Sequence, residues 1–240
     1  MKTALRWLGY IIGVAVVVVV LAVSLVYAVT SARMARTYAT SVPSVAIPTD
    51  SASIARGRHL TETTGKCQVC HGDDYSGKLV FNATVFARLT SANLTSGKSG
   101  IGSVYRDQDW VRSIRYGIAR DGKPLIFMPA EAFTHFSDAD LGQIIAYLKT
   151  LPARDMQVPA EKKIGPIMRV ATLVGGFPLV PASMISPNMR RSDVPEGPTR
   201  EYGEYLAKSG GCTSCHGENL AGMKAGDGDR PNLTRGGDLG

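Results

Sequence analysis

The chain contains the stretch Cys67-Gln68-Val69-Cys70-His71 and repeats its pattern as Cys212-Thr213-Ser214-Cys215-His216. The two copies together hold all 4 cysteines of the 240 residues. Two cysteines three positions apart lie on one helical turn, so both thiols can form thioethers with the vinyl groups of one haem. The histidine that follows supplies a neutral imidazole to one face of the iron. Cys67, Cys70, Cys212 and Cys215 are therefore predicted to hold two haem c groups, with His71 and His216 as iron ligands.

Two Cys-x-x-Cys pairs also suit a four-sulfur zinc site, and a single pair suits a thioredoxin-like redox centre. Neither alternative explains a histidine directly after both pairs, or the glycine that follows each histidine, Gly72 and Gly217. No strand-helix-strand pattern surrounds either pair. Haem attachment is therefore the preferred interpretation.

Residues 7–29 (WLGYIIGVAVVVVVLAVSLVYAV) contain no charged side chain. At about 1.5 Å per residue, a helix over this run would reach roughly 35 Å, enough to span a bilayer. A cleaved signal peptide is the alternative, but its apolar region is usually about 7–15 residues long and this run is longer. We therefore expect an uncleaved, single-pass anchor in the cytoplasmic membrane.

Lys2 and Arg6 precede the apolar run and Arg33 and Arg36 follow it, so the positive-inside rule favours a cytoplasmic N-terminus only weakly. Haem attachment to this motif in bacteria takes place on the outer, periplasmic side of the membrane, so we expect the rest of the chain there. These four residues carry +4 of the formal net charge of +7, which leaves a mild +3 for the exported part. No basic block or basic-aromatic interleaving favours nucleic-acid binding.

The surroundings of the two motifs also repeat. Gly57-Arg58-His59-Leu60 precedes the first motif as Gly203-Glu204-Tyr205-Leu206 precedes the second, and an Asn-Leu-Thr run follows each, at 93–95 and 232–234. Two related domains are therefore expected. The predicted division is residues 1–30 for the cytoplasmic stub and anchor, 31–50 for a polar linker, 51–152 for the first domain, 153–198 for a proline-rich crossover, and 199–240 for the N-terminal part of the second domain.

Helices are predicted in three stretches of the first domain. One starts at Asp50 or Ser51 and runs towards the haem cysteines, and a second covers 109–118. The third follows Ser137, where Leu141, Ile144, Ile145 and Leu148 recur at helical spacing, and Leu151-Pro152 ends it. The apolar middle of the crossover, residues 164–185, is expected to cover the first domain or the domain interface, with a re-entrant membrane contact as the alternative.

Helices around Cys-x-x-Cys-His, an Asn-Leu-Thr run, and Met128-Pro129 before a final amphipathic helix resemble a class I cytochrome c domain. Two such domains, joined by a proline-rich crossover and tied to the membrane, are similar to the membrane-anchored dihaem cytochromes c of bacterial respiratory chains, including the cytochrome subunits of periplasmic dehydrogenases. The resemblance covers residues 51–240. It implies a mainly α fold: an N-terminal transmembrane helix followed by two cytochrome c-like helical domains, the second incomplete in this chain.

On this resemblance Met128, 57 positions after His71, is the second ligand of the first iron, and its thioether raises the reduction potential. A methionine that fills a gap in the core is the alternative. His59 and His135 are rival ligands, although surface or packing roles suit both better.

Structural contacts follow from the resemblance as well. Gly57 and Tyr147 match positions where the first and last helices of a domain cross closely. Pro231 matches the residue whose carbonyl accepts a hydrogen bond from the haem-binding imidazole, and Ala92 stands at that position in the first domain.

The second domain departs from the pattern, because only 24 residues follow His216. Met223 comes soon after the attachment turn and is not expected to reach the far face of the iron. Three explanations remain open: the chain is a fragment of a longer one, a partner subunit supplies the ligand, or the iron is five-coordinate. We favour a fragment.

The predicted function is transfer of single electrons on the outer face of the membrane, with no chemistry of the chain's own. A dehydrogenase or a quinol-oxidising complex would supply electrons, and a terminal oxidase or a soluble cytochrome would accept them. The alternative is a dihaem enzyme of the peroxidase or thiosulfate-oxidising type, with one open haem site.

Overall fold

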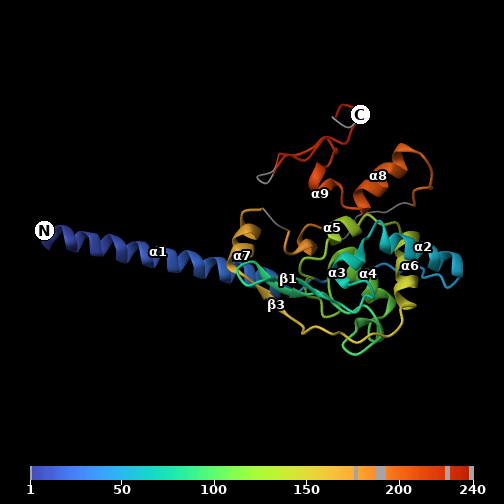
Figure 1. The fold of residues 1–240 in the computed structure, drawn as a ribbon, viewed down its shortest axis with the longest axis horizontal. Helices are drawn as coiled ribbons and strands as arrows, with labels where there is room; N and C mark the ends of the chain where they lie inside the picture. Colours follow the sequence, from blue (N-terminus) through green and yellow to red (C-terminus); the bar gives the residue numbers. More distant parts are fainter. Residues whose placement is uncertain (1, 176–177, 187–192, 225–227, 238–240) are drawn as a thin grey trace.

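A computed structural model describes residues 2–175, 178–186, 193–224 and 228–237 of the protein. Its longest element, α1 (Lys2–Ala35), projects from a globular part that holds the other elements (Figure 1). In the described part of the chain, α1 is the one helix long and apolar enough to cross a membrane, and its apolar side chains are exposed. The predicted span of residues 7–29 is therefore helical, and the helix continues to Ala35.

The three predicted helices form the centre of the globular part: α2 (Ser51–Glu62), α4 (Asp107–Tyr116) and α6 (Asp138–Lys149). The predicted N-caps of α2 and α6 are confirmed. The Asp50 carboxylate accepts a hydrogen bond from the Ser53 amide at 2.9 Å, and the Ser137 hydroxyl accepts one from the Asp140 amide at 3.0 Å. Because these caps are local, the sequence was sufficient to place both helix starts.

The second predicted helix is shifted towards the N-terminus. α4 begins at Asp107 and ends at Tyr116, because Gly117 takes a left-handed conformation with φ of 64° that closes the helix. Ile118 therefore lies beyond the helix, although its side chain is buried.

α2 and α6 cross with their backbones in contact, and this crossing organises the core. A Cβ atom on Gly57 would lie 1.9 Å from the carbonyl oxygen of Gln143, so only glycine fits there. The ring of Tyr147 packs at the edge of the core and against Tyr75, with 6.1 Å between ring centroids. The predicted close crossing at Gly57 is confirmed. The apolar positions predicted for α6 are all buried: Leu141, Ile144, Ile145 and Leu148.

A small antiparallel sheet joins this helical core, and the sequence did not predict it. The strand order is β1 (Leu79–Ala83), β2 (Ala87–Thr90), β3 (Lys162–Ile164). The Arg88 guanidinium on β2 donates two hydrogen bonds to the Glu161 carboxylate, each 2.7 Å long. The helix-rich fold is thus confirmed, with a sheet whose third strand comes from the predicted crossover.

The segment predicted as a linker, residues 31–50, is packed against the globular part. α1 occupies its start, and the remainder packs along the globular part without helix or strand. The Val45 side chain is buried in the main core, with Val42 and Ile47 packed against the same core. These apolar side chains hold the segment down, because leaving them in water would cost hydrophobic free energy.

The crossover, predicted as 153–198, is folded where it is described; residues 176–177 and 187–192 lie outside the described residues. It contains β3, α7 (Pro166–Leu173) and the short 3-10 helix η2 (Pro181–Ser183). Leu179 and Val180 are buried against Ile126 of the first domain. Part of the apolar middle therefore covers the first domain, as expected.

The segment after the crossover contains α8 (Arg200–Ser209) and α9 (Thr213–His216). Residues 225–227 and 238–240 of the predicted second domain lie outside the described residues. The side chain of Tyr205 on α8 belongs to the main core, and its hydroxyl donates a hydrogen bond to the Asp140 carboxylate. The Ser137 amide donates to the same hydroxyl at 3.2 Å. α8 is therefore docked on the start of α6.

Candidate haem-binding site

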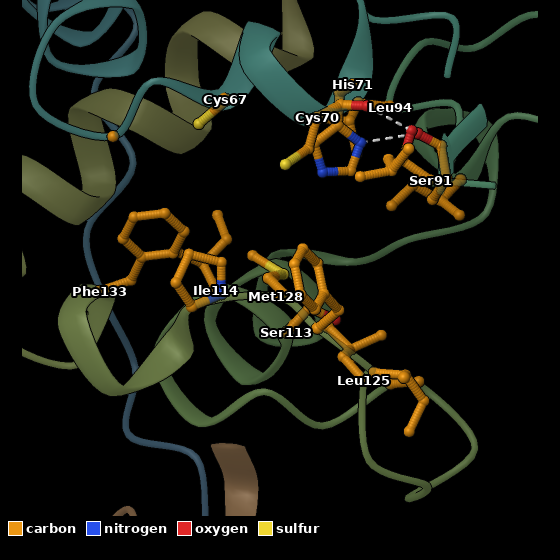
Figure 2. A pocket seen from close by; sticks show the side chains of 18 of the residues that line it. Cys67, Cys70, His71, Ser91, Leu94, Ser113, Ile114, Leu125, Met128 and Phe133 are labelled. Atoms are coloured by element: carbon orange, nitrogen blue, oxygen red, sulfur yellow. Dashed lines mark hydrogen bonds between the residues drawn. The ribbon is translucent and has the colours of Figure 1, made fainter. Parts of the chain in front are cut away.

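A cavity in the globular part of the protein has a volume of about 840 Å³. This is within the range of roughly 300–1,000 Å³ that is usual for ligand and cofactor pockets. Its walls come from α3 (Cys67–His71), α4, α6, α5 (Ala130–Phe133) and the loop before α5 (Figure 2). The side chains that line it are mainly apolar: Leu94, Trp110, Ile114, Phe133, Phe136, Ile144 and Leu148. Such a wall suits a large, flat, mostly apolar group.

The first attachment motif forms one side of this cavity. Figure 2 shows the sulfur atoms of Cys67 and Cys70 facing the same space as the His71 imidazole. Neither cysteine forms a disulfide, and burial raises the pKa of the Cys67 thiol to about 12. Because Cys67 stays a neutral thiol at ordinary pH, it lies at the apolar wall without the cost of burying a charge. The motif therefore places two thiols where they can bond to one group in the cavity.

The His71 ring is held by a hydrogen bond on the side away from the cavity. Its Nδ1 lies 2.7 Å from the carbonyl oxygen of Ala92. A carbonyl can only accept, so Nδ1 carries the proton and Nε2 is left as the nitrogen that can bind a metal. Burial lowers the pKa of His71, opposed by this hydrogen bond, and favours the neutral ring that a metal requires. The expected contact with Ala92 is confirmed.

Met128 lies on the opposite side of the cavity from His71 (Figure 2). The residue before it, Phe127, has a left-handed φ of 67°, which is costly for a side chain of this size. The Phe127 amide donates to the Leu179 carbonyl at 3.2 Å, and its ring stacks edge-on against Phe81, with 4.3 Å between centroids. These contacts hold the loop in a form that turns Met128 inward.

The rival histidines lie elsewhere. His59 is exposed on α2, and His135 follows α5; neither is among the residues that line the cavity. Of the three candidates for the second iron ligand, Met128 is therefore the one that lies across the cavity from His71.

Two further cavity residues escaped the sequence analysis. Met156, from the crossover, reaches the cavity beside Gly77. Its Cε lies 3.0 Å from the point where a Cβ atom on Gly77 would be. Glu131, on α5, has a buried oxygen without a hydrogen-bond partner among the described residues, and burial raises its pKa. No local pattern marks either residue, because only tertiary packing brings them to the cavity.

The second motif repeats the local geometry of the first. His216 Nδ1 lies 2.9 Å from the Pro231 carbonyl oxygen, which confirms the second expected contact. In both copies the asparagine of the Asn-Leu-Thr run accepts from the amide and the hydroxyl of the threonine, each at 2.8 Å. The glycines after the two histidines have φ of 84° and 80°. The repeat seen in the sequence is therefore also a repeat of backbone conformation.

The surroundings of the second motif are more open. Cys212 and Cys215 are exposed, and Met223 stays beside Gly217, with its Cγ 3.4 Å from the position of a Cβ on that glycine. Met223 is thus held near the attachment turn, as expected. The start of this motif also borders the first cavity through Gly210, Gly211 and Ser214.

The two cysteine pairs do not come together around one metal. Among the described residues, no group of three or more His, Cys, Asp or Glu side chains is arranged to hold a metal ion. The four-sulfur zinc alternative therefore has no geometric support in this part of the chain.

Residues 52–148 match the family described as cytochrome c oxidase, cbb3-type, subunit III. This match covers most of the cavity walls, including Cys67, Cys70, His71 and Met128. A cytochrome c domain implies covalently bound haem c, and the cavity with its two thiols and imidazole fits that group.

Three curated relatives are cytochrome or dehydrogenase subunits. The chain is 30% identical over 183 residues to a subunit of the nicotinate dehydrogenase of Pseudomonas putida, a match covering 73% of this chain and 15% of the relative. It is 28% identical over 175 residues to the gluconate 2-dehydrogenase cytochrome c subunit of Pantoea cypripedii, covering 69% and 38%. It is 28% identical over 143 residues to the fructose dehydrogenase cytochrome subunit of Gluconobacter japonicus, covering 53% and 29%.

The chain thus spans between 15% and 38% of the length of these relatives. The site geometry and the matches agree on the class of the first domain. The protein contains a cytochrome c family domain and is homologous to the cytochrome subunits of dehydrogenases.

Proposed function

We propose that the protein is a membrane-anchored dihaem c-type cytochrome that carries single electrons on the outer face of the cytoplasmic membrane. The observation that carries this proposal is the cavity in which the Cys67 and Cys70 thiols and the His71 imidazole face Met128. One cavity thus joins the attachment groups and both candidate ligands of a single haem iron.

The chain's own residues would set the properties of the first site. A haem bound there supplies an iron that exchanges one electron. Cys67 and Cys70 would hold the group covalently, and the hydrogen bond to Ala92 orients His71. The apolar walls exclude water, and the Met128 thioether favours the reduced iron over the oxidised one. Together these features raise the reduction potential of the site.

The second motif would hold a second haem through Cys212 and Cys215, with His216 as its ligand. The repeated hydrogen bond from His216 to Pro231 supports this assignment. Because Gly210, Gly211 and Ser214 border the first cavity, the second attachment turn is next to the first site. This arrangement favours passage of electrons within the chain.

We propose a dehydrogenase as the electron donor and a quinol-oxidising complex as the second candidate donor, with an oxidase or a soluble cytochrome as acceptor. The relatives are named for dehydrogenases of three different substrates, nicotinate, gluconate and fructose. The class of partner is common to them and the substrate is not, so the substrate of the partner is left open. We propose α1 as an uncleaved anchor. The exported location follows from haem attachment, which takes place on the outer side of the membrane.

Intact-protein mass spectrometry tests the two attachment sites separately. Protein from a host that matures c-type cytochromes should carry two porphyrins that survive acid-acetone extraction. The double variant Cys212→Ala, Cys215→Ala should carry one, and the variant Cys67→Ala, Cys70→Ala should carry the other. A single porphyrin on the unaltered chain would overturn the dihaem assignment, and bare polypeptide would overturn the whole proposal.

The open surroundings of the second motif keep a dihaem enzyme as the second candidate function. In the full-length protein, addition of cyanide or peroxide distinguishes the two. An electron carrier with both irons fully ligated keeps its absorption spectrum, whereas an enzyme with an open site changes it.

A further inference from the structure

We propose that α7 and the turn between β1 and β2 form a second contact with the bilayer, lying in the headgroup region beside α1. The α7 surface is defined here by five exposed apolar side chains: Val85, Phe86, Ile167, Val170 and Val174. This inference rests on the proposed role of α1 as a membrane anchor.

One face of α7 is apolar and exposed. Ile167 and Val170 on α7 and Val174, which caps its C-terminal end, recur at helical spacing, with 47%, 48% and 77% of each residue accessible to solvent. The opposite face is already occupied, because Met168 is buried against Leu179 and neighbouring side chains. The exposed face is therefore apolar without a partner among the described residues.

The turn before β2 extends this surface. The Ile167 amide donates to the Val85 carbonyl at 3.1 Å, and the Gly165 amide donates to the Phe86 carbonyl at 2.7 Å. These hydrogen bonds place the turn directly beside the start of α7. Val85 and Phe86 are 53% and 46% exposed. A contiguous group of exposed apolar side chains on two segments indicates an interaction surface more strongly than a single exposed apolar side chain does.

The contact between α7 and α1 sets the depth of this surface. The Arg169 guanidinium donates to the Thr30 hydroxyl at 2.5 Å and to the Ser31 hydroxyl at 3.1 Å, and it lies 4.4 Å from the centre of the Tyr27 ring. These three residues of α1 stand at the end of the apolar run 7–29. If that run fills the hydrocarbon core, Arg169 lies at its boundary, where arginine and tyrosine side chains act as anchors.

The orientation of α7 fits this depth. Figure 1 shows α7 beside the end of α1, on the side of the globular part that faces the N-terminus, and running across the direction of α1. A helix that lies flat in the headgroup region has this orientation relative to a spanning helix. Its apolar face then meets the acyl chains while the globular part stays in water.

Charges near the surface favour lipid over a protein partner. Lys163 is exposed on β3, just before α7, and Arg33 is exposed near the end of α1, whereas Lys162 lines the first cavity. Basic residues next to an apolar helix face are typical of helices bound to anionic headgroups. The surface also adjoins the proposed membrane span of α1, which again favours lipid as its partner.

Site-directed spin labelling of the haem-loaded full chain tests the contact. In the loaded protein the four native cysteines are bonded to haem, so an added cysteine is the one to be labelled. We would compare Val170→Cys and Val174→Cys with Ala55→Cys, an exposed position on α2. Each labelled protein is placed in nanodiscs of phosphatidylethanolamine and phosphatidylglycerol, and collisions with oxygen and with a water-soluble nickel complex are measured.

Labels at Val170 and Val174 should collide severalfold more often with oxygen, relative to nickel, than the label at Ala55. The labels at Val170 and Val174 could instead collide with oxygen and nickel in the same ratio as the label at Ala55, in protein that alkaline carbonate does not remove from membranes. That result would overturn the α7 contact and leave the anchor intact. That result is also the one expected if a protein partner covers this face. Removal of the protein by carbonate would overturn the anchor and, with it, this inference.

Discussion

The backbone carbonyl of Gln143 occupies the space that a side chain on Gly57 would need. A Cβ at Gly57 would lie 1.9 Å from that carbonyl oxygen, and backbone atoms cannot move aside as the end of a flexible side chain can. The crossing of α2 over α6 therefore depends on the absence of a side chain at this position. The cavity wall formed by α6 depends on it in turn.

Gly57→Ala is expected to destabilise the haem-loaded protein by at least about 1–3 kcal/mol, the usual cost of overpacking. The methyl group would force the two helices apart and loosen the core beneath the cavity. Denaturant unfolding followed by circular dichroism measures the change in the free energy of unfolding.

Gly203→Ala is the matched control, because Gly203 is in α8 with nothing within 4 Å of its Cβ position. Alanine should stabilise that helix by about 0.5–1 kcal/mol. Equal stability of Gly57→Ala and the unaltered protein would show that the two helices are not in contact at this point.

Two methionines, Met128 and Met156, line different parts of the first cavity. Met128→His should lower the potential of the first haem by at least about 59 mV, a tenfold change in the one-electron equilibrium, because the thioether favours reduced iron. Covalent haem should be retained. Met156→Leu, at another part of the same wall, should shift the potential much less. Redox titration with mass spectrometry measures both; an unchanged potential in Met128→His would remove Met128 from the ligand role.

Local signals in the sequence were sufficient for much of this architecture. The caps at Asp50 and Ser137 hydrogen-bond within three residues, and the Cys-x-x-Cys-His spacing fits a single helical turn. The sheet could not be predicted in the same way, because β3 pairs with β2 across more than 70 residues of chain, with Lys162 opposite Leu89. Each strand is also too short to show an alternating pattern.

The contacts of the predicted linker could not be derived from its sequence for a related reason. Its composition is polar, but Val45 packs in a core built by residues much later in the chain. The left-handed conformation of Phe127 likewise has no signal in its own residue type, since packing against Phe81 and Leu179 selects it. Tertiary contacts, rather than local preference, determine these features.

Tyr205→Phe is expected to loosen the docking of α8. The hydroxyl donates to the Asp140 carboxylate and accepts from the Ser137 amide, and burial together with the Asp140 contact raises the pKa of Tyr205. Its loss leaves a buried amide without a partner, at a cost of about 1–3 kcal/mol. Faster hydrogen exchange over α8 measures this.

Tyr202→Phe is the control on the same helix. Its hydroxyl contacts Arg56 at 3.0 Å from a less buried position, so the cost should be below about 1 kcal/mol. Equal exchange over α8 in the two variants would contradict the docking role of Tyr205.

Glu131 at the cavity wall should make stability depend on pH. Burial raises its pKa above the ordinary value of 4.5, so the folded state binds this proton more tightly than the unfolded state does. The resulting stabilisation is complete below about pH 4.5 and is lost as the pH rises through the raised pKa.

Glu131→Gln removes the ionisable group. The difference in melting temperature between Glu131→Gln and the unaltered protein should therefore become more positive from about pH 4.5 to pH 7. Glu201→Gln, at an exposed position of α8, measures the effect of losing any one negative charge. If Glu131→Gln and Glu201→Gln change the melting temperature by the same amount at every pH, Glu131 is not buried in its charged form.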